Sequence, residues 1–154
     1  MLAKVGAESA QYWDIHNSVE PEGGDYGYRS RASDEQIGPN VPRPSFWAFQ
    51  KVSDALRGQL VEASSGEDNL TTYLATKGNR KSLVVINKSA LTSFNAKLAI
   101  PGFSGKAKVE TLAAPGQAAG TLIKMNAPDS KSMDIKEGQS YNFPSNSITT
   151  ITIE

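Results

Sequence analysis

Residues 147–154 read SITTITIE, and this stretch gives the clearest indication of how the chain folds. Isoleucine and threonine are both β-branched and favour the extended backbone of a β-strand. The isoleucines stand at positions 148, 151 and 153, so the alternation slips by one residue between the first two. We therefore expect a strand here, with a bulge at the slip.

Further strand-like runs fill the chain between this stretch and Gly58. They are separated by links rich in turn-forming residues, such as SSGEDN, KGNRK and APGQAAG. The run LVVI at 83–86 is continuously apolar and indicates a central strand, whereas 113–136 is polar and loop-like, with room for one edge strand. The pattern predicts a mainly β protein, an antiparallel β-sandwich of about seven to nine strands. The expected strands cover 60–63, 70–75, 83–87, 94–100, 106–112, 141–143 and 148–153.

One helix is expected before the strands, over residues 45–57, which read SFWAFQKVSDALR. Pro44 suits a first helical turn, and Gly58 suits the position just after a helix. An apolar stripe at helical spacing predicts that the helix packs on the sandwich and that Phe49 is buried there. The stripe consists of Phe46, Phe49, Val52 and Leu56, with Trp47 and Ala48 widening it.

Charge and composition exclude several classes of function. The 154 residues carry 16 basic and 16 acidic side chains, so no net charge attracts the protein to nucleic acid or to an anionic membrane. There is no cysteine and only one histidine, His16, which leaves no thiolate or histidine-rich metal site. We therefore expect no metal and no cofactor. No run approaches the roughly 20 apolar residues that a membrane-spanning helix needs.

Residues 11–40 have a different character from the rest of the chain. They combine aromatic residues, acids and turn formers, and only AQYWDI at 10–15 resembles a strand. A long irregular stretch of this kind is unusual inside a compact domain and is commonly functional or displaced from its normal surroundings.

The order of these segments resembles the C-terminal end of secreted bacterial glycoside hydrolases of clan A. The segments that carry the resemblance are QYWDIHN at 11–17, EPEGGDYGYRS at 20–30, PRPSFWAFQKVSDALRG at 42–58 and a β-sandwich entered through LVEASS that contains SLVVINKS. The nearest likeness is to the family 44 endoglucanases and to related arabinofuranosidase-like and family 39-like enzymes. It covers nearly the whole chain.

This resemblance implies two parts and a parent enzyme. Residues 1–58 would be the remnant of the last βα unit of a (β/α)₈ barrel, with a loop and the helix at 45–57, and residues 59–154 would be a β-sandwich that packs on the catalytic barrel and stabilises it. Retaining glycosidases use two carboxylates about 5–5.5 Å apart. In these families both lie on barrel strands that would precede residue 1. The resemblance thus implies a fragment of a bacterial extracellular enzyme, without catalytic residues of its own.

Four aromatic residues are candidate carbohydrate contacts: Trp13, Tyr26, Tyr28 and Trp47. A flat aromatic ring can stack on the C–H face of a sugar while neighbouring polar groups bond its hydroxyls. The alternative is that the aromatics of the loop and helix form the hydrophobic seam between helix and sandwich, and the spacing of the phenylalanines favours this. The predicted strands contain no tryptophan, which argues against a dedicated sugar-binding patch on them.

Three functions therefore compete. The leading one is a non-catalytic accessory domain, and the second is a carbohydrate-binding module for plant cell-wall polysaccharide. The third is a small enzyme that uses Glu20, Glu22 or His16, although a loop with two adjacent glycines cannot preorganise an acid and a base. These acids, or the group at 67–69, could also offer oxygens to Ca²⁺, but neither matches an EF-hand. We also expect self-association through residues 1–57, because their apolar residues would lack a barrel to cover them.

Overall fold

The computed structural model describes residues 16–17, 28–30, 38–114 and 127–154. Within these ranges the main element is a six-stranded sheet in which all neighbouring strands are antiparallel, in the order β3-β4-β5-β10-β7-β8. Its strands are β3 (Gln59–Val61), β4 (Leu70–Lys77), β5 (Arg80–Asn87), β7 (Gly105–Ala113), β8 (Asp129–Ile135) and β10 (Ser147–Ile153).

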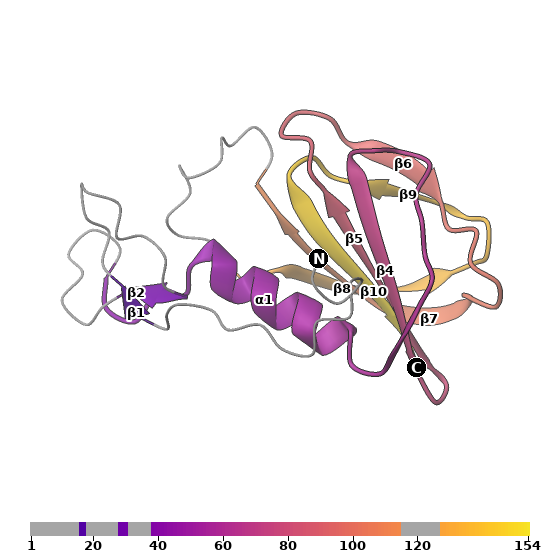
Figure 1. Cartoon of the computed structure of the whole chain (residues 1–154), viewed down its shortest axis with the longest axis horizontal. Coiled ribbons are helices and arrows are strands. Elements are labelled where there is room, and N and C mark those ends of the chain that lie inside the picture. Colours follow the sequence, from indigo (N-terminus) through magenta and orange to yellow (C-terminus); the bar gives the residue numbers. More distant parts are fainter. Residues whose placement is uncertain (1–15, 18–27, 31–37, 115–126) are drawn as a thin grey trace.

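Two smaller strand pairs complete the described sheets. The strands β6 (Phe94–Lys97) and β9 (Ser140–Phe143) form an antiparallel pair that packs over one face of the main sheet. The strands β1 (His16–Asn17) and β2 (Arg29–Ser30) form a short parallel pair. Figure 1 shows the β6–β9 pair beside the main sheet and the β1–β2 pair at the far end of the molecule. The predicted antiparallel β-sandwich is confirmed.

The strand β10 lies at the centre of the main sheet, and it contains no bulge. Its pairing with β5 and with β7 runs without interruption from Ser147 to Ile153, so the predicted bulge is wrong. The isoleucine spacing has another cause, because both faces of β10 are covered. Ile148 faces the helix side, whereas Ile151 and Ile153 lie in the sandwich core. Apolar residues therefore occur on both faces of an uninterrupted strand.

The main core fills the space between the six-stranded sheet and the β6–β9 pair. Phe103, Phe143, Ile135 and Ile151 are among its most deeply buried side chains. Asn87, at the end of β5, is also buried, and its Nδ2 group lies 2.8 Å from the backbone oxygens of both Thr92 and Pro144. The buried amide is thus satisfied, and it joins the main sheet to the loops that enter β6 and leave β9.

The helix α1 (Pro44–Ala55) covers the opposite face of the main sheet. Pro44 opens it, as expected, but it ends two residues earlier than predicted. Residues from its second half pack on the sheet, where they meet Tyr73 and Val84. They are Val52 and Ala55 of the helix, together with Leu56, which directly follows it.

Phe49 does not belong to this contact. Its side chain is 57% exposed, so the prediction that it is a buried anchor of the helix is wrong. The apolar stripe was wider than the part of the helix that touches the sheet, and the helix docks through its C-terminal half.

The remaining differences from the predicted strands are small. The strand expected at 94–100 ends at Lys97, and the polar segment 113–136 does contain an edge strand, β8, most of whose residues are exposed. The basic turn of the sequence is the tip of the β4–β5 hairpin, with Gly78 at a φ of 60°. A positive φ of this kind suits glycine in a two-residue hairpin loop.

Candidate functional site

Two of the four candidate carbohydrate contacts, Trp13 and Tyr26, lie outside the described residues. The other two, Tyr28 and Trp47, are both half-buried near the first half of α1. The Tyr28 ring lies 5.2 Å from the Phe49 ring, and the Trp47 ring meets the Phe46 ring edge-on at 5.0 Å. We call these four residues, Tyr28, Phe46, Trp47 and Phe49, the aromatic cluster.

Backbone pairing holds Tyr28 beside the helix. The carbonyl of Tyr28 accepts a hydrogen bond from the N–H of Arg43 (2.9 Å), and the N–H of Ser30 donates to the carbonyl of Val41 (3.0 Å). The Ser30 hydroxyl is buried, and it accepts a further hydrogen bond from the N–H of Val41 at 2.7 Å. The short segment at 28–30 is therefore fixed to the chain that enters α1.

A cation completes the aromatic cluster. The guanidinium carbon of Arg29 lies 4.5 Å from the centre of the Phe46 ring, within the range of a cation–π contact. The same side chain donates to the carbonyl of Asn40 at 3.0 Å. Arg29 was not among the candidate site residues predicted from the sequence. The signal that could have identified it is its position directly after Tyr28, which was a candidate. The cluster thus offers flat apolar faces beside a positive charge, which suits contact with either a protein surface or a sugar.

The aromatic cluster is not the seam between helix and sheet. That seam consists of smaller aliphatic residues from the second half of α1, whereas Phe49 is largely exposed. The interpretation of these aromatics as a helix–sandwich seam is therefore wrong for Phe49. Tyr28 and Trp47 stay candidate contact residues for a partner or a ligand.

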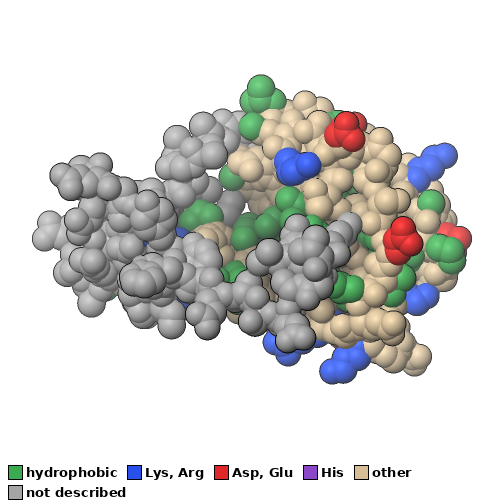
Figure 2. Space-filling model, viewed as in Figure 1, with side chains coloured by type: hydrophobic (Ala, Val, Ile, Leu, Met, Phe, Trp, Pro, Cys, Tyr) green, Lys and Arg blue, Asp and Glu red, His purple; other side chains and the backbone are tan. Residues whose placement is uncertain are grey.

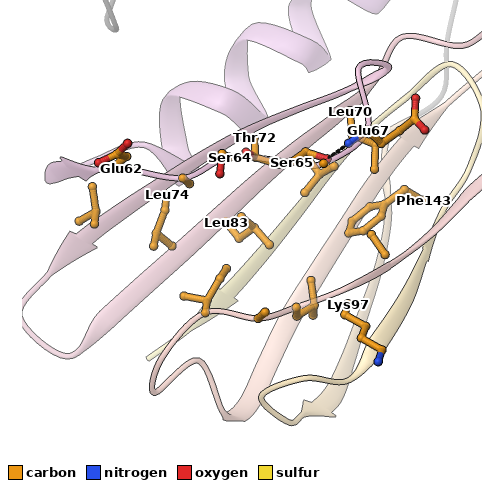
Figure 3. A pocket seen from close by; sticks show the side chains of 18 of the residues that line it. Glu62, Ser64, Ser65, Glu67, Leu70, Thr72, Leu74, Leu83, Lys97 and Phe143 are labelled. Carbon is orange, nitrogen blue, oxygen red and sulfur yellow. Dashed lines mark hydrogen bonds between the residues drawn. The ribbon is translucent and has the colours of Figure 1, made fainter.

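A second feature is a cleft in the sandwich, on the side of the main sheet opposite α1. Its volume is about 730 Å³, within the range of ligand pockets. In Figure 3, Leu70, Leu74 and Leu83 of the main sheet form its apolar floor, and Phe143 of β9 also lines it. The β3–β4 loop at 62–67 forms one wall, and the segment at 96–101 forms the other.

Polar groups lie on the walls of this cleft. Ser64, Ser65 and Glu67 belong to the loop wall, and Lys97 lies on the opposite wall (Figure 3). The Glu67 carboxylate accepts hydrogen bonds from the backbone N–H and the side-chain amide of Asn69, at 3.1 and 3.0 Å. It therefore closes a turn of its own loop. The cleft could not be foreseen from sequence, because its floor residues have the pattern of ordinary core strands.

The carboxylate of Glu110 has a lowered pKa, and its partners are two lysines that give it a structural role. Glu110 on β7 bonds Lys51 of α1 at 2.9 Å and Lys108 at 3.0 Å. Burial alone would raise the pKa of Glu110, but the hydrogen bonds and charges of the two lysines outweigh it and hold the pKa below its usual value. This group joins the helix to the sheet.

Among residues 16–17, 28–30, 38–114 and 127–154, no three histidine, cysteine or acidic residues come together as a metal site would require. No helix in these ranges is long and apolar enough to cross a membrane. On the face shown in Figure 2, basic and acidic side chains are scattered singly over the sandwich.

Comparisons with known proteins find similarity in structure only. No protein-family model matches the sequence, and no curated protein matches it. A family 51 α-L-arabinofuranosidase matches 94% of this chain with 24% of its own, at a TM-score of 0.67 and 18% identity. The α-L-arabinofuranosidase of Thermotoga maritima matches 84% of this chain with 32% of its own, at a TM-score of 0.62 and 17% identity.

A family 30 endoxylanase from Clostridium papyrosolvens is also similar. It matches 71% of this chain with 27% of its own, at a TM-score of 0.53 and 15% identity. The chain thus spans about a quarter to a third of the length of these enzymes. At such identities the likeness establishes a shared fold, and at that level the predicted resemblance to arabinofuranosidase-like enzymes is confirmed.

Proposed function

We propose that this chain is a non-catalytic accessory β-sandwich of a secreted bacterial glycoside hydrolase that degrades polysaccharides. In this proposal it packs on the catalytic (β/α)₈ barrel and stabilises it. The observation that carries the proposal is the fold likeness to about a third of each of several glycoside hydrolases, arabinofuranosidases among them. The described residues contain one helix, whereas a barrel of eight βα units needs eight and typically takes about 250 residues.

The surface of α1 supports the same proposal. The helix uses its second half to cover the main sheet, and its first half carries the aromatic cluster. Phe49 is 57% exposed, and large aromatic side chains are enriched where proteins meet one another. The cluster is therefore the surface that we assign to the barrel contact.

Self-association of the isolated chain tests this assignment. We expect light scattering to show dimers or larger species, and Phe49→Ser to shift the chain towards monomer. Leu91→Ser is the matched control, because Leu91 is 83% exposed on the β5–β6 loop and lies outside α1 and the cluster. A chain that is monomeric at every concentration, or one that Leu91→Ser dissociates equally, would overturn the assignment of the cluster as an interface.

Catalysis is tested directly. Incubation with aryl glycosides and with soluble β-glucans is expected to release no more reducing sugar than buffer does. Turnover that Glu20→Gln or Glu22→Gln abolishes would instead establish a small enzyme and contradict the proposal.

A carbohydrate-binding module is the second candidate, favoured by the placement of Tyr28, Trp47 and Arg29 at one end of α1. Affinity electrophoresis on gels that contain xylan, mannan, xyloglucan or β-glucan distinguishes the accessory domain from the binding module. Unretarded migration supports the accessory domain. Retardation that Trp47→Ala or Tyr26→Ala removes, and that Leu91→Ser retains, supports the binding module.

A further inference from the structure

The two layers of the sandwich are unequal. Among the described residues, the main sheet has six strands, whereas the layer that faces it has only β6 and β9. The cleft lies where this smaller layer ends, above the β4 and β5 residues Leu70, Leu74, Leu83 and Val85. The cleft therefore lies beside the C-terminal end of β6 and the segment that follows it.

The edge of β6 that faces away from β9 has backbone groups to which a further strand can bond. The backbone N–H of Leu98 donates to the carbonyl of Gln139, and the N–H of Gly138 donates to the carbonyl of Leu98, both at 2.9 Å. The backbone groups of Leu98 therefore point towards the chain that enters β9. In an antiparallel pair, successive residues direct their backbone N–H and C=O groups alternately towards the partner strand and away from it. Ala96, two residues before Leu98, therefore also bonds to β9. Asn95 and Lys97 direct their N–H and C=O groups away from β9, to the free edge of β6. Within the described part of the chain, those groups of Asn95 and Lys97 have no hydrogen-bond partner.

The dimensions of the cleft agree with one added strand. Ala96 and Lys97 of β6, followed by residues 98–101, form this wall of the cleft. The four residues of β6 span about 13 Å at 3.3 Å per residue, which pairs with roughly four residues of extended peptide. The floor offers aliphatic side chains to every second residue of that peptide. Lys97 is exposed on the outer side of β6, so an acidic residue opposite it would complement its charge.

We propose that the cleft is a strand acceptor: an extended peptide with alternating apolar and polar residues binds antiparallel to the free edge of β6. Strand addition uses unpaired backbone groups such as those of Asn95 and Lys97, because main-chain hydrogen bonds give affinity. Alternate side chains of the peptide would fill the aliphatic floor beside Lys97. This proposal is independent of the accessory role, because it concerns the opposite face of the main sheet from α1.

The test uses the whole chain and the synthetic peptide acetyl-TVEVTVT-amide, whose valines would face the floor and whose glutamate would lie opposite Lys97. Nuclear magnetic resonance titration is expected to show binding, and hydrogen exchange of the Lys97 amide is expected to slow by about tenfold or more at saturation. The same residues reordered as VVVTTET are expected to bind at least about tenfold more weakly.

Backbone methylation separates strand pairing from simple filling of an apolar cleft. In the antiparallel arrangement the N–H groups of the peptide's glutamate and of its middle threonine face β6, and those of its second and third valines face away. N-methylation of the glutamate and the middle threonine should abolish binding, and N-methylation of the two valines should retain it. Equal tolerance of both, or the absence of binding by the parent peptide, would overturn the proposal.

Protein variants provide a second line. Lys97→Pro removes the N–H that faces the cleft without removing a bond to β9, and it should abolish binding, whereas Lys97→Ala should retain it within about threefold. If Lys97→Pro fails to fold, the methylated peptides still decide the matter. Binding to a folded Lys97→Pro chain at the original affinity would show that the cleft takes an apolar ligand without strand pairing.

Discussion

The Nζ atom of Lys51, in the middle of α1, lies 2.9 Å from Oε1 of Glu110 on β7. Both side chains are mostly buried, and they join the helix to the sheet across 59 positions of sequence. The contact lies on the side of α1 that faces the sheet, whereas Phe49 of the aromatic cluster is largely exposed.

Removing this contact should destabilise the fold. We expect Lys51→Met to lower the free energy of unfolding by about 1 kcal/mol, because the pair is partly shielded from water but still screened. Urea unfolding measures the change. Lys108→Met is the control on the same carboxylate, since Lys108 is 58% exposed, and it should cost less than about 0.5 kcal/mol. Equal costs for the two variants would contradict the structural role of Lys51.

The Glu110 carboxylate should also make stability depend on pH. Its pKa in the folded chain lies below the usual value, so its contribution is fully present above the pKa of the unfolded chain and is lost as the pH falls through the lowered pKa. The stability difference between the native chain and Glu110→Gln should therefore be constant from pH 7 to about 5 and shrink below about pH 4. Unfolding measured across this range provides the check, and a difference unchanged at low pH would refute it.

Arg80 should stabilise the end of α1. Its guanidinium donates to the carbonyl of Asp54 at 2.9 Å and lies 3.5 Å from the carbonyl of Ala55, and these groups lack partners within the helix. Its positive charge also complements the C-terminal end of the helix dipole. Arg80→Ala should cost about 1–2 kcal/mol of unfolding free energy. Arg57→Ala, which breaks only an exposed pair with Asp54, should cost less than about 0.5 kcal/mol.

Two phenylalanines should differ sharply in their effect on stability. Phe143→Ala should cost about 3–5 kcal/mol, because this ring is fully buried in the main core. Phe49→Ala should cost less than about 1 kcal/mol, because the ring is largely exposed. Thermal or chemical unfolding compares them, and a large cost for Phe49→Ala would mean that the helix docks through its first half.

Most of the strands were predictable from local patterns. Residues 83–87 and 148–153 alternate or run apolar over lengths typical of strands, and the structure places both in the centre of the main sheet. The local pattern gave a wrong prediction at Ile148. The isoleucine spacing predicted a bulge, whereas Ile148 and Ile151 lie on opposite faces of a regular strand. Whether one or both faces of a strand are covered depends on α1, which is distant in sequence.

The helix illustrates the same limit. Its start at Pro44 follows from backbone chemistry, but the stripe at 46, 49, 52 and 56 did not reveal which of these residues would be buried. The contacts of Lys51 with Glu110 and of Arg80 with the last helical carbonyls accompany docking through the second half. Neither partner could be recognised from spacing within the helix.

Local sequence was enough to specify the class of fold, because alternation, turn residues and helix ends act over a few neighbouring positions. The orientation of α1, the exposure of Phe49 and the cleft beside β6 were set by tertiary packing. They depend on contacts between segments such as 62–67 and 96–101, which lie on opposite walls although some thirty residues separate them. Such contacts arise when the two layers of the sandwich pack together, so the pattern of neighbouring residues in the sequence does not predict them.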